Sequence, residues 1–135
     1  VSALRAVGAD THAHDPLIEY LTRMGQGVFQ YPTPDGYPDK TSPWLGTLLW
    51  RWNFAFALST GGVPSVEAPS AKLVNAIGAT GDAPEVKLFE HLTGHAPTDE
   101  QQKALAEATE GKSKGVETAK ELIGLIIASP SFQRY

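Results

Sequence analysis

Two aspartates of this sequence, Asp35 and Asp39, flank Tyr37 in a proline-rich stretch that leads to Trp44. A pair of carboxyl groups, one protonated and one ionised, can act as general acid and base on a glycosidic bond, and flat aromatic rings stack on sugars. The pattern therefore suits a small hydrolase acting on polysaccharide. In that hypothesis Asp35 and Asp39 are the catalytic pair, and Tyr37 and Trp44 bind the carbohydrate ligand.

The same stretch has a structural interpretation, which we favour. Asp35 and the glycine after it are typical of a turn. Arg51 and Asn53 are the strongly polar members of an otherwise apolar segment, and a buried guanidinium without an acceptor costs several kcal/mol. We therefore expect Arg51 and Asn53 to be structural residues, with Arg51 neutralised by Asp35 or Asp39.

Histidines offer two further candidate sites. His12 and His14 have acidic neighbours, as a metal site requires; however, they lie between the end of one expected helix and the start of the next, where Asp15 is a sufficient N-cap. His91 and His95 have the spacing of one helix face, but a helix end is expected between them. We expect no metal and no cofactor, and keep a metal-binding module using His12 and His14 as a third hypothesis.

Composition excludes several classes of function. The 135 residues include 11 Lys and Arg against 15 Asp and Glu, which gives a net charge of −4, and no Cys. A mildly acidic chain lacks the basic face that nucleic acid and anionic membranes require, so we expect neither as a partner. The absence of Cys excludes disulfides, thiolate metal sites and cysteine nucleophiles.

Helices must position all of these residues. Apolar residues recur at helical spacing in segments that begin near residues 1, 15, 47, 69, 82 and 116, and a capping box marks a further helix near residue 98. No segment alternates as a strand would. Residues 26–43 form a long loop, because its prolines exclude a helix. We predict a single all-α domain over residues 1–135, a compact irregular bundle of six or seven short helices.

The segment 47–58 is apolar almost all round, so we expect it to be the central helix, with most of Trp44, Trp50 and Trp52 in the core. Capping boxes are predicted at residues 82–85 and 98–101. In the last helix, residues 116–128, Gly124 would allow another helix to approach closely.

Three stretches carry a family resemblance: residues 31–39 (YPTPDGYPD), 51–55 (RWNFA) and 128–133 (ASPSFQ). With residues 1–8 and Trp44, they resemble the C-terminal part of the bacterial family named "domain of unknown function eighteen hundred".

The resemblance implies a helical protein of several hundred residues, often exported, with no settled activity. It also implies that this chain is a C-terminal fragment or truncated relative, exported or periplasmic, whose partner is the N-terminal half of its parent. We therefore expect a structural or half-site module. An apolar surface left by the missing half would also favour a homo-oligomer.

Overall fold

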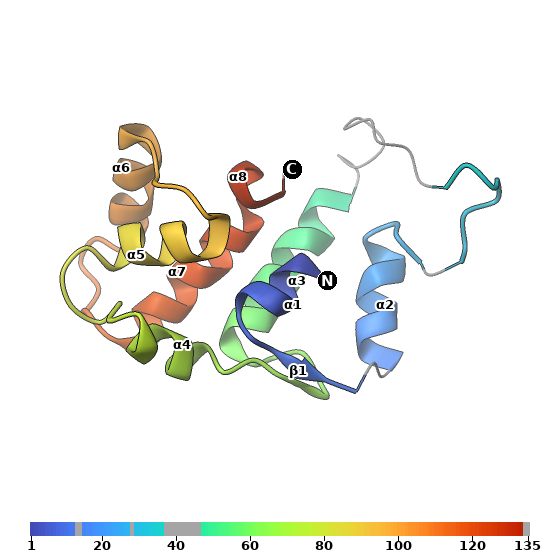
Figure 1. Ribbon diagram of the computed structural model, residues 1–135, viewed down its shortest axis with the longest axis horizontal. Coiled ribbons are helices and arrows are strands. Elements are labelled where there is room, and N and C mark those ends of the chain that lie inside the picture. The colour runs from blue at the N-terminus through green and yellow to red at the C-terminus, as the bar shows by residue number, and fades with distance from the viewer. Residues whose placement is uncertain (13–14, 28, 37–46, 134–135) are drawn as a thin grey trace.

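The computed structural model describes residues 1–12, 15–27, 29–36 and 47–133. Within these ranges the chain is all-α, as predicted, with a pair of two-residue strands added (Figure 1). The elements are α1 (Ser2–Ala6), β1 (Asp10–Thr11), α2 (Asp15–Arg23), α3 (Leu48–Thr60), β2 (Val66–Glu67), α4 (Ser70–Ala76), α5 (Pro84–Thr93), α6 (Asp99–Ala108), α7 (Val116–Ala128) and α8 (Pro130–Gln133).

Local sequence signals account for most helix ends. α3 stops at Gly61, whose φ of 79° is left-handed, a conformation that glycine adopts without strain. At α6 the predicted capping box is present: Thr98 Oγ1 accepts from the Gln101 amide at 3.3 Å, and Gln101 Oε1 accepts from the Thr98 amide at 2.8 Å. α6 therefore begins directly after the N-cap that the sequence predicts.

The other predicted capping box is wrong. The N-cap of α5 is Ala83, in the left-handed region with φ 47°, and no side-chain cap hydrogen bond forms. The cause is a shift of one residue, since Pro84 takes the first helical position. Asp82 therefore precedes the cap, and its carboxylate does not meet the helix amides as a capping box requires.

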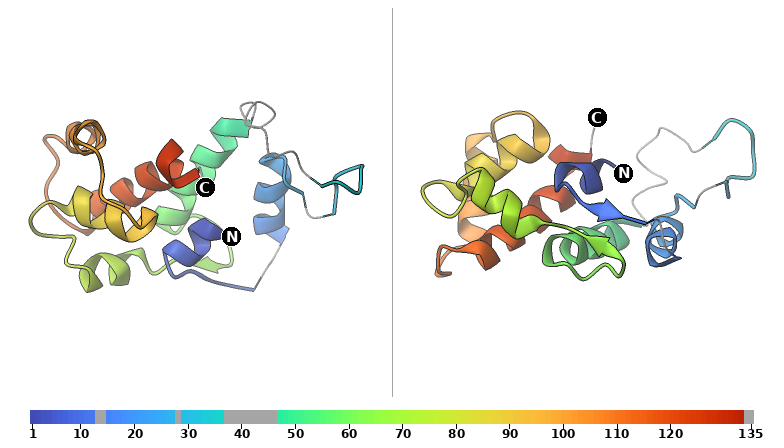
Figure 2. Two further views of the ribbon diagram at one scale, coloured as in Figure 1. Left: turned by 45° about the horizontal axis from the view of Figure 1, so that its top comes forward. Right: turned by 60° about the horizontal axis from the view of Figure 1, so that its bottom comes forward.

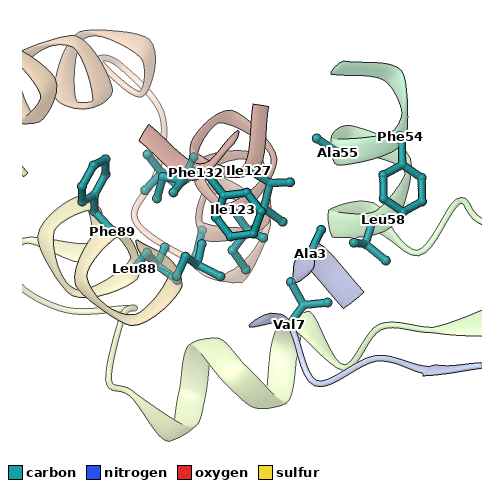
Figure 3. Packing of buried hydrophobic residues seen from close by; sticks show 14 of the residues in the cluster. Ala3, Val7, Phe54, Ala55, Leu58, Leu88, Phe89, Ile123, Ile127 and Phe132 are labelled. Atoms are coloured by element: carbon teal, nitrogen blue, oxygen red, sulfur yellow. The ribbon is translucent and has the colours of Figure 1, made fainter. Parts of the chain in front are cut away.

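The centre of the molecule is α7. Its Leu122, Ile123 and Ile126 are fully enclosed, and α3, α4, α5 and α8 all pack on it. Figure 3 shows Ile123 and Ile127 of α7 between Leu88 and Phe89 on one side and residues of α3 and α1 on the other. In the second half of α7, aliphatic residues lie on nearly all sides, which suits it to this position.

The expectation that the helix over residues 47–58 would be enclosed is wrong. Phe54, Ala55 and Leu58 of α3 are buried, but Leu49 is 63%, Trp52 45% and Phe56 38% exposed. Trp52 is thus a surface residue, although Trp50 packs against the core. Because α7 already takes the centre, α3 covers it from one side and keeps an apolar face outward.

Gly124 brings α3 and α7 close together, as predicted. A Cβ atom built on Gly124 would lie 2.8 Å from Cδ1 of Phe56 and 2.9 Å from Oγ of Ser59. Any side chain at this position would therefore push against α3.

The strands were not predicted. β1 and β2 pair antiparallel, with Asp10 opposite Glu67 and Thr11 opposite Val66. Two residues are too few to show the alternation that indicates a strand from sequence. Their pairing ties the segment after α1 to the segment after α3.

Candidate functional site

The region around Arg51 is shaped by the way α2 meets α3. The Tyr20 ring lies 5.3 Å from that of Phe54, at an interplanar angle of 59°. The Arg23 guanidinium lies 4.4 Å above the Trp50 ring, within the range of a cation–π contact. Figures 1 and 2 show α2 at one side of the molecule, standing beside α3 and away from α5 and α6.

A pocket of about 300 Å³ opens between α2 and the rest of the bundle. α1, α2, α3, α7 and α8 all contribute to its walls, as does the segment that follows α2. The described residues that line it are Val1, Ser2, Ala3, Leu4, Leu17, Leu21, Met24, Gln26, Arg51, Phe54, Ile127, Phe132 and Gln133. Most of these are apolar, so the walls form a largely apolar surface with a few polar groups.

Arg51 is the one charged side chain among the described residues of this lining. It is half-buried on α3, and its Nε donates to Thr47 Oγ1 at 3.4 Å. Partial removal from water lowers the pKa of its guanidinium below the ordinary arginine value, since burial disfavours the charged form. An arginine nevertheless stays protonated throughout the physiological range.

The predicted acid/base pair is described only in part. Asp35 is exposed on the loop after α2, and the positive φ of 78° at Gly36 agrees with a turn there. Asp35 does not line this pocket, and it does not line the other pocket, which lies where α5, α6 and the start of α7 meet. Asp39, Tyr37 and Trp44 lie outside the described residues, so the catalytic pair and the sugar platform stay predictions.

The sequence predicted that Asp35 or Asp39 neutralises Arg51. For Asp39 this stays a prediction, because Asp39 lies outside the described residues. Asp35 takes part in none of the salt bridges that the structure records among described residues. Asn53 lies on the exposed face of α3, where water can satisfy its amide.

The three histidines that the structure describes occupy separate surface positions. His12 is exposed after β1, and His14 lies outside the described residues. His91 is in α5, whereas His95 follows its end and packs edge-on against Phe89, with ring centroids 5.5 Å apart. Across the described ranges, no three His, Cys, Asp or Glu side chains gather in a way that could hold a metal ion.

A second pocket, of about 230 Å³, lies where α5, α6 and the start of α7 meet. Its lining includes Lys112, Lys114 and Thr118. Lys112 forms a salt bridge with Glu121, so its charge already has a partner within the fold. This pocket lies apart from Arg51.

Sequence reasoning singled out Arg51 but missed the pocket around it. Leu17, Leu21 and Met24 recur at helical spacing in the sequence, and all three line the same pocket. Phe132 and Gln133, from α8, carry no local sequence pattern that indicates a pocket. A pocket whose walls come from helices at both ends of the chain leaves no local pattern.

The family model described as "Protein of unknown function (DUF1800)" matches residues 1–134 of the sequence. The chain belongs to this family. The resemblance expected from the residues is therefore confirmed. No curated protein and no solved structure matches the chain.

In this DUF1800 chain, the described lining of the pocket at Arg51 is largely apolar and includes one charged side chain. No carboxylate and no imidazole belongs to the part of its lining that the structure describes. Proton transfer needs such groups within hydrogen-bond reach. Along the described ranges, no helix has the length and the apolar character to span a membrane.

Proposed function

We propose that this chain is a half-site module: a helical domain that docks on the remaining part of a longer parent protein through the outer face of α3. The observation that carries this function is the apolar stripe formed by Leu49, Trp52 and Phe56, all exposed on one helix. Their spacing of three and four residues puts them on the same side. Large contiguous apolar surfaces on soluble proteins mark interaction sites.

The chemistry of the stripe fits an uncharged helical surface as its occupant. Arg51 is the one charged residue of α3, and it lies on the pocket side. The stripe itself is bordered by Asn53 and Thr60, which are neutral. A face without charge favours another apolar face, and the family resemblance implies a helical N-terminal half that could supply it.

The test supplies the two parts of the parent protein as separate polypeptides and measures their association by calorimetry. We expect Trp52→Glu to weaken the association by more than about tenfold, because large aromatic anchors dominate interface energy. Because Trp52 is only 45% exposed, circular dichroism first establishes that the Trp52→Glu variant is folded. The matched control is Ala104→Glu, at an exposed position of α6, and it should bind as the native chain does. Equal affinity of the Trp52→Glu variant would contradict the proposal.

The polysaccharide hydrolase is kept as an alternative proposal, supported by the solvent accessibility of Asp35. Its test is an assay on soluble glycans with Asp35→Asn and Asp39→Asn variants. The hydrolase predicts a loss of activity of at least about a hundredfold in either variant, the scale of general acid–base catalysis. Activity that persists in both variants, or is absent from the native chain, would exclude it.

From the resemblance we also propose that the parent protein is bacterial and exported. Fractionation of the cells, with an antibody against this domain, should find it outside the cytoplasm. Recovery in the cytoplasmic fraction would contradict export without affecting the docking of α3.

A further inference from the structure

The pocket where α5, α6 and the start of α7 meet has the size of a site for a very small molecule. Its volume of about 230 Å³ is below the range for pockets that hold drug-sized ligands, roughly 300–1,000 Å³. The described residues that line it lie between 79 and 119, inside the range 47–133, which the structure describes without a gap. Its apolar wall consists of small side chains, namely Ala79, Ala83, Pro84, Ala106 and Ala119.

Two side chains of opposite charge line this pocket from different elements. Glu85 is in the first turn of α5, and Lys114 lies in the segment between α6 and α7. Among the described residues, neither side chain takes part in a salt bridge, with the other or with a third group. Lys112 also lines the pocket, but it pairs with Glu121. The pocket therefore offers one cationic and one anionic group to a ligand.

Threonine hydroxyls in the lining add hydrogen-bond acceptors. Thr109 Oγ1 donates to the Ala106 carbonyl at 3.1 Å, and Thr118 Oγ1 donates to the Ser113 carbonyl at 2.7 Å. A hydroxyl has one proton and two lone pairs, so both oxygens can still accept from an N–H group. The pocket thus suits a ligand that carries an ammonium group as well as an anionic one.

We propose that this pocket binds a free amino acid with a short side chain. The carboxylate of the ligand lies against Lys114, its ammonium lies against Glu85, and its side chain lies against the alanines of the wall. A zwitterion uses both charged groups, whereas a simple anion or cation uses one and is repelled by the other. This site is separate from the docking of α3, because Leu49, Trp52 and Phe56 are not among the described residues that line it.

The first test uses the unmodified protein and three probes: L-alanine, propionate, which lacks the ammonium, and ethylammonium, which lacks the carboxylate. Titrations followed by nuclear magnetic resonance should show saturable binding of alanine. Propionate and ethylammonium should each bind at least about tenfold more weakly, the scale of one hydrogen bond to a charged group. Phenylalanine should also bind more weakly, because its ring exceeds the pocket. Equal binding of alanine and propionate, or no saturable binding of alanine, would overturn the proposal.

The second test assigns each end of the ligand to one side chain. Lys114→Gln should weaken alanine by about tenfold without weakening ethylammonium, which has no carboxylate to lose a partner. Glu85→Gln should weaken alanine to a similar extent without weakening propionate. The matched controls are Lys72→Gln and Glu90→Gln, at exposed positions that do not line the pocket, and both should bind alanine as the native protein does.

The third test fills the pocket. Ala106 is exposed on α6 and lines the pocket, whereas Ala104 is exposed on the same helix and does not. Ala106→Leu should therefore weaken alanine, and Ala104→Leu should leave its binding unchanged. Circular dichroism shows whether each variant is folded. Native affinity for alanine in every folded variant of the lining would overturn the assignment.

Discussion

Two buried serines differ in whether their hydroxyl has a partner. Ser59 Oγ of α3 donates to the Phe56 carbonyl at 3.1 Å. Ser70 Oγ, at the start of α4, is buried and has no hydrogen-bond partner among the described residues. Burying a polar group without a partner costs more than replacing it by an apolar one.

We therefore expect Ser70→Ala to raise the free energy of unfolding by about 1 kcal/mol, because it removes an unsatisfied hydroxyl. Ser59→Ala is the matched comparison and should lower it by about 0.5 kcal/mol, because it removes a hydrogen bond. Urea denaturation measures both. A loss of stability in Ser70→Ala would show that this hydroxyl is bonded in solution.

Gly124 is the residue at which the spacing of two helices is decided. Alanine there would gain about 1 kcal/mol of helix propensity, but overpacking typically costs about 1–3 kcal/mol. The contacts with Phe56 and Ser59, at 2.8 and 2.9 Å from the added carbon, indicate that overpacking dominates.

We expect Gly124→Ala to lower the free energy of unfolding by about 1 kcal/mol. In a Phe56→Ala background the same substitution should cost less, because the ring that it meets is gone. Denaturation of the four proteins of this cycle measures the difference. The same cost in both backgrounds would show that Phe56 does not limit the approach of α3 to α7.

At the scale of elements, two helices with similar sequence signals begin differently. α6 has a complete capping box at Thr98, whereas α5 begins at Ala83 with no side-chain cap. The two sequences look alike, and the proline after Ala83 shifts the start of α5 by one residue. Capping motifs therefore predict the first residue of a helix to within one position. They do not predict which side-chain atoms accept hydrogen bonds from the first helical amides.

This difference predicts opposite outcomes for two matched substitutions. Thr98→Ala should lower the free energy of unfolding by about 1 kcal/mol, because it removes an N-cap oxygen that accepts from a helix amide. Asp82→Ala should leave it unchanged within about 0.5 kcal/mol, since it caps nothing. Thermal or urea unfolding measures both. A large loss in Asp82→Ala would mean that its carboxylate caps α5 after all.

At the scale of the whole molecule, the decisive feature is that α7, rather than α3, takes the centre. α3 consequently packs on one side of α7, with Leu49, Trp52 and Phe56 exposed and with Arg51 and Phe54 among the residues that line the pocket. Stripe and pocket thus lie on different faces of one helix. Leu49, Trp52 and Phe56 are not among the described residues that line the pocket.

An uncovered stripe should make the chain self-associate when it is alone. We expect light scattering to show an average mass that rises with protein concentration, and Trp52→Glu to return it toward the monomer mass of 14.4 kDa. The physical reason is that Trp52 would be buried between copies. A native chain that stays monomeric at high concentration would contradict this expectation.

The sequence by itself determined the all-α class, the extent of α7 and the box at Thr98, because helix periodicity, caps and proline stops act within a few residues. It also determined that another helix could pack closely at Gly124 and that Arg51 was the charged residue of an otherwise apolar helix. Only the tertiary structure decided which apolar helix would be enclosed, and it placed Trp52 at the surface. It also gathered α1, α2, α3, α7 and α8 around one pocket. Whether a helix is buried depends on which helices pack against it from distant parts of the chain. The spacing of apolar residues within α3 or α7 therefore does not show which of the two is enclosed.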